Sequence, residues 1–295
     1  MHELYTVHQC SEPSKASELT DDVKQNVRAF AFKGHSNLSA EIIDAFPNLG
    51  LIANYGVGYD TIDVGYATTK NIAVTNTPDV LTDDVADLAV GMLLALTRDI
   101  IGASNWVQSG NWAKSGSYPL QRTISGVDIG IAGLGRIGHA VATRLQSFNA
   151  NIHYYSRSSK DTPGWVFHQD LNDLAKAVDI LMVTVSGGPD TDGIISADVI
   201  KSLGSDGVIV NSARGSTVDE EALIQALQKS QLRGAALDVY RDEPNIDPRF
   251  MALDNVLLQP HQSSGTVETR KRMGELQRQN LSAFFSDKPL ITQVN

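Results

Sequence analysis

A glycine-rich turn at residues 133–138 constrains the fold of this 295-residue chain more than any other feature. The turn reads Gly133-Leu134-Gly135-Arg136-Ile137-Gly138, follows an apolar run at 128–132 and leads into a helical pattern at 139–148. The first glycine permits a tight turn, the second lets backbone approach a pyrophosphate, and the third lets the helix pack on the strand. This context predicts a dinucleotide site at the helix N-terminus, with a turn kept for packing alone as the alternative.

Short apolar runs alternate with helical patterns along nearly the whole chain, which predicts parallel sheets covered by helices. The length suits two domains. A long helix is expected from Thr82 to about Gly102, because apolar residues recur there at helical spacing. Residues 104–126 have weak periodicity and predict an extended arm or a long connection. The expected strands span residues 27–32, 51–54, 73–75, 128–132, 151–155, 180–185, 208–211, 235–238 and 256–258.

Charge and composition exclude several classes of function. The formal net charge of −10 argues against nucleic-acid binding, because phosphate contacts need a basic face. No run approaches the ~20 apolar residues of a membrane helix, and the N-terminus shows no signal peptide, so a cytoplasmic protein is expected. The one cysteine, Cys10, is expected to be a small buried or half-buried side chain rather than a catalytic thiol. No metal site is expected.

The residues after the strand at 151–155 bear on which nicotinamide dinucleotide binds. That strand ends in Ser156-Arg157-Ser158, where an NAD-binding protein usually carries an acidic residue for the ribose 2′-hydroxyl. Arg157, flanked by two hydroxyls, suits a charge-assisted contact to a 2′-phosphate instead. The sequence therefore favours NADP over NAD. The alternative is an exposed turn with Arg157 in water and less selective binding of NAD.

Reactive side chains follow three later strands, at the sheet edge where open α/β sheets bind ligands. Reduction of a 2-keto acid needs a cation for the carboxylate and the carbonyl, a proton donor, and a group that keeps the donor protonated. Arg214 suits the first role because a guanidinium is planar and permanently charged. His261 suits the second because imidazoles titrate near neutral pH, and Glu243 suits the third because a nearby carboxylate favours the imidazolium form. Each alone has a structural alternative, but their placement at one edge favours a catalytic set.

With these residues in view, the chain resembles the D-isomer-specific 2-hydroxyacid dehydrogenase family over nearly its whole length. The resemblance is strongest to the glyoxylate/hydroxypyruvate reductase-like members that use NADPH, and the run Ser156-Arg157-Ser158 supports that choice. Five blocks carry it, at residues 54–60 with 62–64, 76–78 leading to 85–87, 133–138, 211–215, and 237–244 with 260–266.

The resemblance implies roles for residues at matching positions. Arg214, Glu243 and His261 match the catalytic trio, with His261 as the acid/base and Arg214 also binding substrate. Val57 and Gly58 match the loop whose N–H groups hold the substrate carboxylate. Asp238 matches the acid that contacts the nicotinamide carboxamide. The full set expected to bind the cofactor is Gly133, Leu134, Gly135, Arg136, Ile137, Gly138, Ser156, Arg157, Ser158, Thr184, Val185, Ser212, Ala213, Asp238, His261 and Ser264.

The family fold implies two doubly wound parallel-sheet domains with the active site in the cleft between them. A Rossmann-type dinucleotide-binding domain is expected at 84–265, and a flavodoxin-like substrate domain at 1–83 together with 266–295. Members are usually homodimers that associate through the long helix and the arm. The family normally opens with one more strand and helix before the segment matched by residues 4–8, so the substrate domain is expected to lack its first unit. A proline often found in the family is replaced by Ser186.

The expected function is reduction of a small 2-keto acid, such as glyoxylate or hydroxypyruvate, by hydride transfer from NADPH. One alternative is another specialisation of the family, such as phosphoglycerate oxidation, which the lack of a C-terminal extension after Asn295 disfavours. Formate oxidation is disfavoured because that branch carries Gln where this chain has Glu243. Another alternative is a non-catalytic nucleotide sensor or corepressor on the same fold. A pure binding module has no chemical need for the set Arg214, Glu243 and His261.

Overall fold

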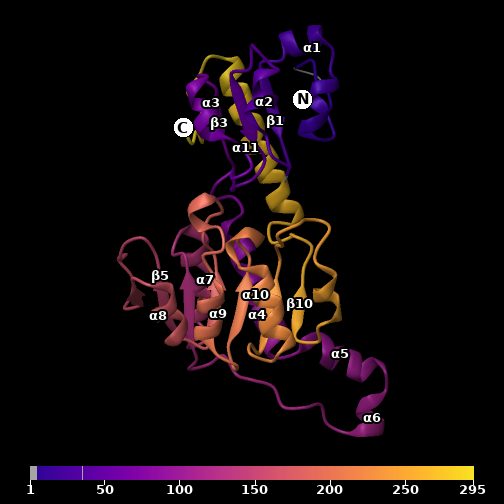
Figure 1. Cartoon of the computed structure of the whole chain (residues 1–295), viewed down its shortest axis with the longest axis vertical. Coiled ribbons are helices and arrows are strands. Elements are labelled where there is room, and N and C mark those ends of the chain that lie inside the picture. Colours follow the sequence, from indigo (N-terminus) through magenta and orange to yellow (C-terminus); the bar gives the residue numbers. More distant parts are fainter. Residues whose placement is uncertain (1–4, 35) are drawn as a thin grey trace. The chain divides into compact units, whose positions relative to one another are not determined.

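Parallel β-strands, gathered into two sheets, form the framework of the computed structural model, which describes residues 5–34 and 36–295 (Figure 1). The chain divides into two compact units, each with its own sheet. Unit 1 consists of the described residues up to Leu81 together with Ser264–Asn295, and unit 2 consists of Thr82–Ser263. The predicted class, α/β with two parallel-sheet domains, is confirmed.

Seven parallel strands form the sheet of unit 2, in the order β10-β9-β8-β7-β4-β5-β6. The chain runs from β4 outward to β6 and then returns to the other side of β4 to build β7 through β10. This reversal makes the carboxyl ends of β4 and β7 the switch point where doubly wound sheets bind dinucleotides. The strands are β4 (Asp128–Ala132), β5 (Asn151–Tyr155), β6 (Val166–His168), β7 (Ile180–Val183), β8 (Val208–Asn211), β9 (Gly234–Leu237) and β10 (Val256–Leu258).

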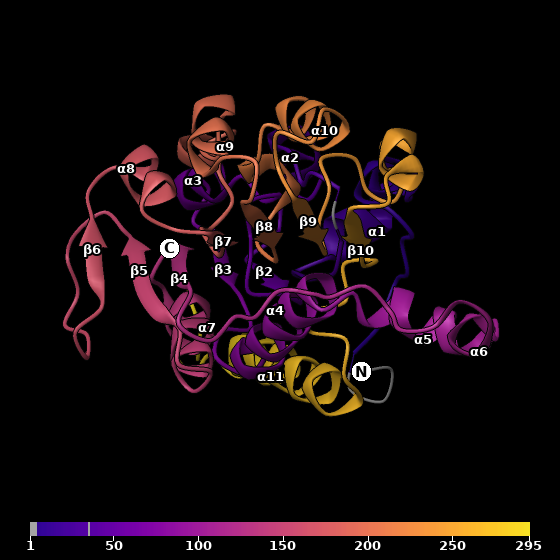
Figure 2. The same cartoon turned by 90° about the horizontal axis from the view of Figure 1, so that it is seen from below.

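Helices cover both faces of this sheet, with α8, α9 and α10 on one face and α4 and α7 on the other (Figure 2). Every residue of β7, β8 and β9 is therefore buried, as expected for inner strands of a parallel sheet. Side chains cap the N-termini of α8, α9 and α10. Asp170, Ser196 and Asp219 each accept a backbone N–H from the first turn of the helix that follows. The helices are α4 (Thr82–Thr97), α7 (Arg136–Gln146), α8 (Leu171–Lys176), α9 (Ala197–Leu203) and α10 (Glu220–Gln228).

The segment after α4 differs from the prediction. The long helix ends at Thr97 rather than near Gly102, because Asp99 adopts a left-handed backbone (φ +44°) and caps a new helix, α5 (Ile100–Gln108). A second short helix, α6 (Asn111–Ser115), follows, so the expected extended arm is helical at residues 104–108 and 111–115 and irregular after that. Both helices lie away from the sheet of unit 2 (Figure 1).

Several further expectations about strands and about Cys10 need correction. Strand β6 was not predicted, because its three residues are exposed or only partly buried and show no apolar run. The predicted strand 27–32 begins only at Ala29, the one at 180–185 ends at Val183, and the one at 235–238 runs one residue earlier. Cys10 is exposed rather than buried or half-buried, because residues 5–10 form no strand or helix that packs it into a core.

Three parallel strands form the sheet of unit 1, in the order β1-β2-β3. One face, including Ile52 and Val74, packs against the cluster that contains α2 and α3, whereas Leu51 and Ala53 on the other face pack against Leu281 of α11. The flavodoxin-like sheet expected for the substrate domain has five strands, and the described part of unit 1 has three. The elements are η1 (Pro13–Glu18), α1 (Asp21–Asn26), β1 (Ala29–Phe32), α2 (Ala40–Asp44), β2 (Leu51–Asn54), α3 (Val64–Thr69), β3 (Ala73–Thr75) and α11 (Val267–Phe285).

In the part of the chain that the structure describes, every helix is too short or too polar to cross a membrane.

Candidate active site

The turn between β4 and α7 is built on two glycines that no other residue can replace. Gly133 has a φ of +104°, and a Cβ there would lie 2.7 Å from the backbone nitrogen of Val185. A Cβ on Gly138 would lie 2.1 Å from the carbonyl oxygen of Gly133, so α7 packs directly on the turn. Thr184 at the end of β7 donates its hydroxyl to the same carbonyl at 2.8 Å. The turn is therefore held rigidly at the switch point of the sheet.

The start of α7 has the properties of a phosphate cradle. Gly135 precedes the helix in an extended conformation and is exposed, and a Cβ there would meet no protein atom within 4 Å. The first N–H groups of a helix have no intrahelical acceptor and, with the helix dipole, favour an anion. Arg136 is also exposed, whereas Leu134 and Gly138 are buried and Ile137 is half-buried against the core.

The turn after β5 presents a cation to solvent. Ser156 donates its hydroxyl to the carbonyl of Ser158 at 2.6 Å, which closes the turn. Arg157 between them is exposed, and no side chain within 5–34 or 36–295 is seen to pair with its guanidinium. The segment through Lys160 contains no acidic residue.

The loop after β8 fixes the backbone of Arg214. Its carbonyl accepts the side-chain amide of Asn211 at 2.9 Å and the hydroxyl of Thr217 at 2.6 Å. The guanidinium donates back to the carbonyl of Ala213 at 2.8 Å. The hydroxyl of Ser212 is buried and has no hydrogen-bond partner among the described residues, so the loop offers a polar group that a ligand can satisfy.

Gly215 brings the arginine loop against the loop after β9. A Cβ at this position would lie 1.9 Å from the carbonyl carbon of Tyr240 and 2.4 Å from the nitrogen of Arg241. Only a residue without a side chain allows the two backbones to approach this closely. Arg214 is therefore held beside the segment that carries Glu243.

Glu243 and His261 form a direct contact between the loops after β9 and β10. Nδ1 of His261 lies 2.6 Å from Oε2 of Glu243, and the side chains are 28% and 17% exposed. The other carboxylate oxygen, Oε1, accepts the backbone N–H of Tyr240 at 2.9 Å. A carboxylate fixed in this way orients the imidazole through its Nδ1 atom.

Tyr240 and Asp238 hold these loops together. The hydroxyl of Tyr240 donates to the carbonyl of Leu237 at 3.1 Å or that of Gln259 at 2.9 Å, and it accepts the N–H of Gln259 at 3.1 Å. Burial raises the pKa of Tyr240 to about 12, so the hydroxyl keeps its proton over the working pH range. Asp238 is fully buried; its contact with the nicotinamide stays a prediction.

The carboxylate of Asp238 fixes the turn that follows His261. It accepts the N–H of Gln262 at 2.8 Å, the N–H of Ser263 at 2.9 Å and the hydroxyl of Ser263. These bonds support the left-handed backbone of His261 (φ +49°), a conformation that is uncommon for residues other than glycine.

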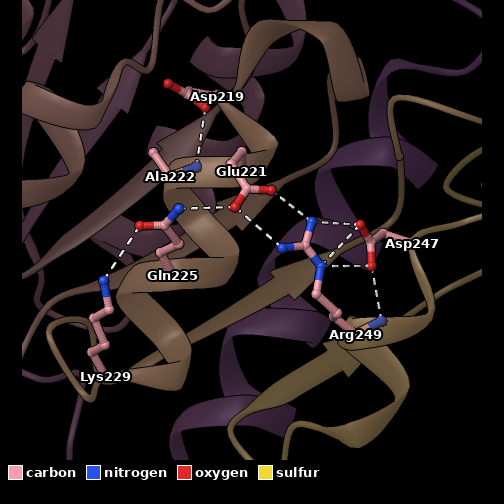
Figure 3. A network of polar contacts seen from close by, with 7 residues as sticks. All are labelled: Asp219, Glu221, Ala222, Gln225, Lys229, Asp247 and Arg249. Carbon is pink, nitrogen blue, oxygen red and sulfur yellow. Dashed lines mark hydrogen bonds and ion pairs between the residues drawn. The ribbon is translucent and has the colours of Figure 1, made fainter.

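A network of ion pairs on the surface connects the loop between β9 and β10 to α10 (Figure 3). Arg249 contacts Glu221 at 2.6 Å and Asp247 at 2.7 Å. The guanidinium lowers the pKa of Glu221 to about 2. The neighbouring Glu220 accepts the N–H of Arg241 at 3.0 Å. The segment that carries Glu243 is thus anchored to α10 on both sides.

The predicted residues of unit 1 lie on separate loops. Val57 and Gly58 are half-buried in the loop after β2, and Ser264 is half-buried just before α11. The cleft predicted between the two domains stays a prediction. Within residues 5–34 and 36–295, no cluster of three or more His, Cys, Asp or Glu side chains is arranged to hold a metal ion.

Sequence reasoning did not single out the supporting residues Tyr240, Glu221 and Arg249. Tyr240 lies inside a recognised block, and the adjacent Glu220 and Glu221 in the first turn of α10 give a weak signal. Both signals are local, whereas the contacts that matter join residues far apart in the chain.

Known proteins resemble this chain over almost its entire length. The family model for the D-isomer specific 2-hydroxyacid dehydrogenase, NAD binding domain, matches residues 90–263. A 2-ketogluconate reductase of Gluconobacter oxydans is 41% identical over 294 residues, which cover 100% of this chain and 93% of the relative. A glyoxylate/hydroxypyruvate reductase A of Arabidopsis thaliana is 43% identical over 284 residues, which cover 96% of this chain and 90% of the relative.

A solved structure agrees with these relatives. The NADPH-dependent glyoxylate/hydroxypyruvate reductase from Sinorhizobium meliloti, in complex with NADP and malonate, is 43% identical and superposes with a TM-score of 0.90. The match covers 95% of this chain and 87% of that chain. The chain described here therefore belongs to the D-isomer-specific 2-hydroxyacid dehydrogenases, a family of oxidoreductases, and carries their NAD-binding domain.

Proposed function

We propose that this protein reduces a small 2-keto acid to the D-2-hydroxy acid with hydride from NADPH. The contact between His261 and Glu243 at 2.6 Å carries the proposal. It lies past the carboxyl ends of β9 and β10, in the unit that also holds the glycine turn and Arg214. A non-catalytic sensor of the same fold needs the turn but not this pair.

The residues of unit 2 fit a bound dinucleotide. The open backbone of Gly135 at the start of α7 suits a pyrophosphate, and the unpartnered hydroxyl of Ser212 suits a polar group of the cofactor. We assign the walls of the cofactor cleft to Thr184, Val185 and Ala213. Asp238 and Ser264 are expected to make further contacts with the cofactor. When bound, the nicotinamide supplies the hydride, and the protein supplies orientation and charge.

Arg157 supports a preference for NADP over NAD. Its guanidinium is exposed at the end of β5, between Ser156 and Ser158, where an acidic residue would repel a 2′-phosphate. An arginine binds phosphate with a planar fork of donors, and the neighbouring hydroxyl of Ser158 adds a further donor.

The chemistry of the protein side chains follows from their contacts. Nδ1 of His261 faces Glu243, so we assign donation of the proton to the substrate oxygen to Nε2. Arg214 stabilises the carboxylate and the developing charge on that oxygen. The N–H groups of Val57 and Gly58 hold the carboxylate. The reaction consumes one hydride and one proton for each keto acid reduced.

Glyoxylate and hydroxypyruvate are the proposed substrates, in keeping with the names of the Arabidopsis and Sinorhizobium relatives. A second candidate is 2-ketogluconate, because the Gluconobacter relative named for it aligns with 100% of this chain. All three are 2-keto acids, so one catalytic set serves each of them.

Homodimerisation through the segment after α4 is also proposed. Several large apolar side chains there face solvent, which favours a protein partner surface. The exposed fraction is 64% for Trp112 and 99% for Leu120, and Ile100, Ile101 and Val107 are also exposed. Light scattering is expected to give a dimer for the wild type and monomer for a Trp112→Asp/Ile101→Asp variant. A monomeric wild type would contradict this. Cytoplasmic location stays a prediction.

The test of the proposed function is oxidation of NADPH and of NADH, followed by absorbance, with each of the three keto acids. Fast turnover with NADPH and slow turnover with NADH is expected. Equal turnover with both cofactors would support the reductase activity but contradict the proposed role of Arg157 in binding the 2′-phosphate. Binding of NADPH without turnover of any keto acid, in a folded protein, would favour the sensor.

A further inference from the structure

The loop at residues 56–58 of unit 1 has all its carbonyl groups engaged. The carbonyl of Gly56 accepts the side-chain amide of Asn54 at 3.1 Å and the N–H of Thr77 at 2.9 Å. That of Val57 accepts the side-chain amide of Asn76 at 2.9 Å. That of Gly58 accepts the amide of Asn54 at 2.8 Å. Two asparagines thus bind three consecutive carbonyls.

Both asparagines are fixed in place. Asn54 ends β2 and is 5% exposed, and Asn76 follows β3 and is 7% exposed. Thr292 holds the backbone of Asn76. Its hydroxyl donates to the carbonyl of Asn76 at 2.6 Å, and its backbone carbonyl accepts the N–H of Asn76 at 3.3 Å. Because an unsatisfied buried amide is costly, these side chains have little freedom to leave their carbonyl partners.

Peptide geometry converts these bonds into a direction for the N–H groups. In a trans peptide the carbonyl and the N–H of the next residue point in opposite directions. With the carbonyls of Gly56 and Val57 turned toward the asparagines, the N–H groups of Val57 and Gly58 turn away from them. No acceptor for either N–H is seen among residues 5–34 and 36–295. Successive N–H groups presented together form an anion-binding concavity.

We infer that Asn54 and Asn76 are the positioning residues for carboxylate recognition in this enzyme. Neither touches the substrate; each fixes the peptide planes whose N–H groups bind it. This inference rests on the proposed function, since it assigns the anion as the carboxylate of the 2-keto acid. A binding interaction that is equal in the ground state and the transition state changes KM rather than kcat.

The test compares Asn76→Asp and Asn54→Ala with a matched control, Asn48→Asp. Asn48 lies in the same unit and also donates its amide to a backbone carbonyl, that of Gln25 at 2.7 Å, but it makes no contact with the carbonyls of residues 56–58. Asn76→Asp keeps the size of the side chain but replaces the donor by a negative charge, whereas Asn54→Ala removes a donor without adding charge, so an effect shared by both variants reports the lost donor. The loop variants are expected to raise KM for the keto acid about 10–100-fold, with kcat within about threefold.

Two binding measurements separate positioning from general damage. The Kd of oxalate, a dicarboxylate that cannot be reduced, is expected to rise with KM, whereas the Kd of NADPH stays unchanged. The control variant is expected to match the wild type in all of these values. Unchanged oxalate affinity in both loop variants, or parallel loss of NADPH binding, would overturn the inference. A wild type that binds oxalate but reduces no keto acid would overturn the proposed function instead.

Discussion

Glu243 and Arg249 both lie on the stretch between β9 and β10. Each forms an ion-pair contact of the same length, but in different surroundings. His261 meets Glu243 at 2.6 Å, and Arg249 meets Glu221 at 2.6 Å. The first pair is 28% and 17% exposed and shares its carboxylate with a backbone N–H. The second pair is 40% and 56% exposed and belongs to a surface network with Asp247 and Gln225.

The difference shows that distance alone does not reveal the role of an ion pair. Solvent screens the exposed pair, so it contributes little to stability and serves to anchor the loop. The half-buried pair lies past the ends of two strands, where an imidazole can exchange a proton with a ligand. Substitutions in each of the two contacts separate a chemical role from an anchoring role.

Removal of the imidazole is expected to have the largest effect. His261→Ala should lower kcat for keto acid reduction about 10²–10⁴-fold, because the proton donor is lost. The Kd of NADPH, measured by fluorescence titration, should not change. His8→Ala, at an exposed position in unit 1, serves as the control. Near-normal turnover in His261→Ala would show that the pair is structural.

Replacing the partner carboxylate is expected to have a smaller effect. Glu243→Gln should lower kcat at neutral pH by about tenfold or more, because the imidazole loses the anionic partner that orients it. The measurement is kcat for keto acid reduction, taken beside the Kd of NADPH, which should not change. An unchanged kcat in the folded variant would contradict the assigned role of Glu243.

Arg157 is expected to affect only one cofactor. Arg157→Ala should raise KM for NADPH about tenfold through loss of a charge-assisted contact, and leave KM for NADH nearly unchanged. The NADH series is the internal control, since it lacks the 2′-phosphate. Equal changes for both cofactors would place Arg157 elsewhere in the site.

The surface network is expected to give the smallest effect on turnover. Arg249→Ala should change kcat less than about threefold and lower Tm by a few degrees at most. The pKa of Glu221 is lowered from 4.5 to about 2, so its contribution to stability is present above pH 4.5 and is lost as the pH falls toward 2. The Tm difference between wild type and variant should therefore shrink over that window. A difference that grows on acidification would contradict the assigned charge pairing.

Local pattern predicted most of the sheet framework. The strands at 51–54, 73–75, 128–132, 151–155, 208–211 and 256–258 match the structure residue for residue, because each contains a short apolar run in the sequence. The segment after α4 was predicted poorly for the opposite reason. Its helices start after residues with a left-handed backbone, Asp99 and Gly110, and Trp106 makes an edge-to-face contact with Tyr118. Neither feature produces a periodic apolar pattern in the sequence.

The identities of the expected catalytic residues came from the sequence, but their support did not. Arg214, Glu243 and His261 belong to recognisable blocks, and the structure brings Glu243 and His261 into contact. The bonds that orient them come from Tyr240 and Asp238. Such bonds join a side chain to the backbone of another element, and no local periodicity encodes that pairing.

The close backbone contact at Gly215 limits which insertions and substitutions this enzyme can accept. Because the arginine loop and the loop after β9 touch backbone to backbone there, an insertion in one would displace the other. Redesign of substrate range is therefore better directed at segments that carry no such contact. Residues 214–215 and 240–241 are best treated as one indivisible unit when family members are recombined, exchanged together or left alone.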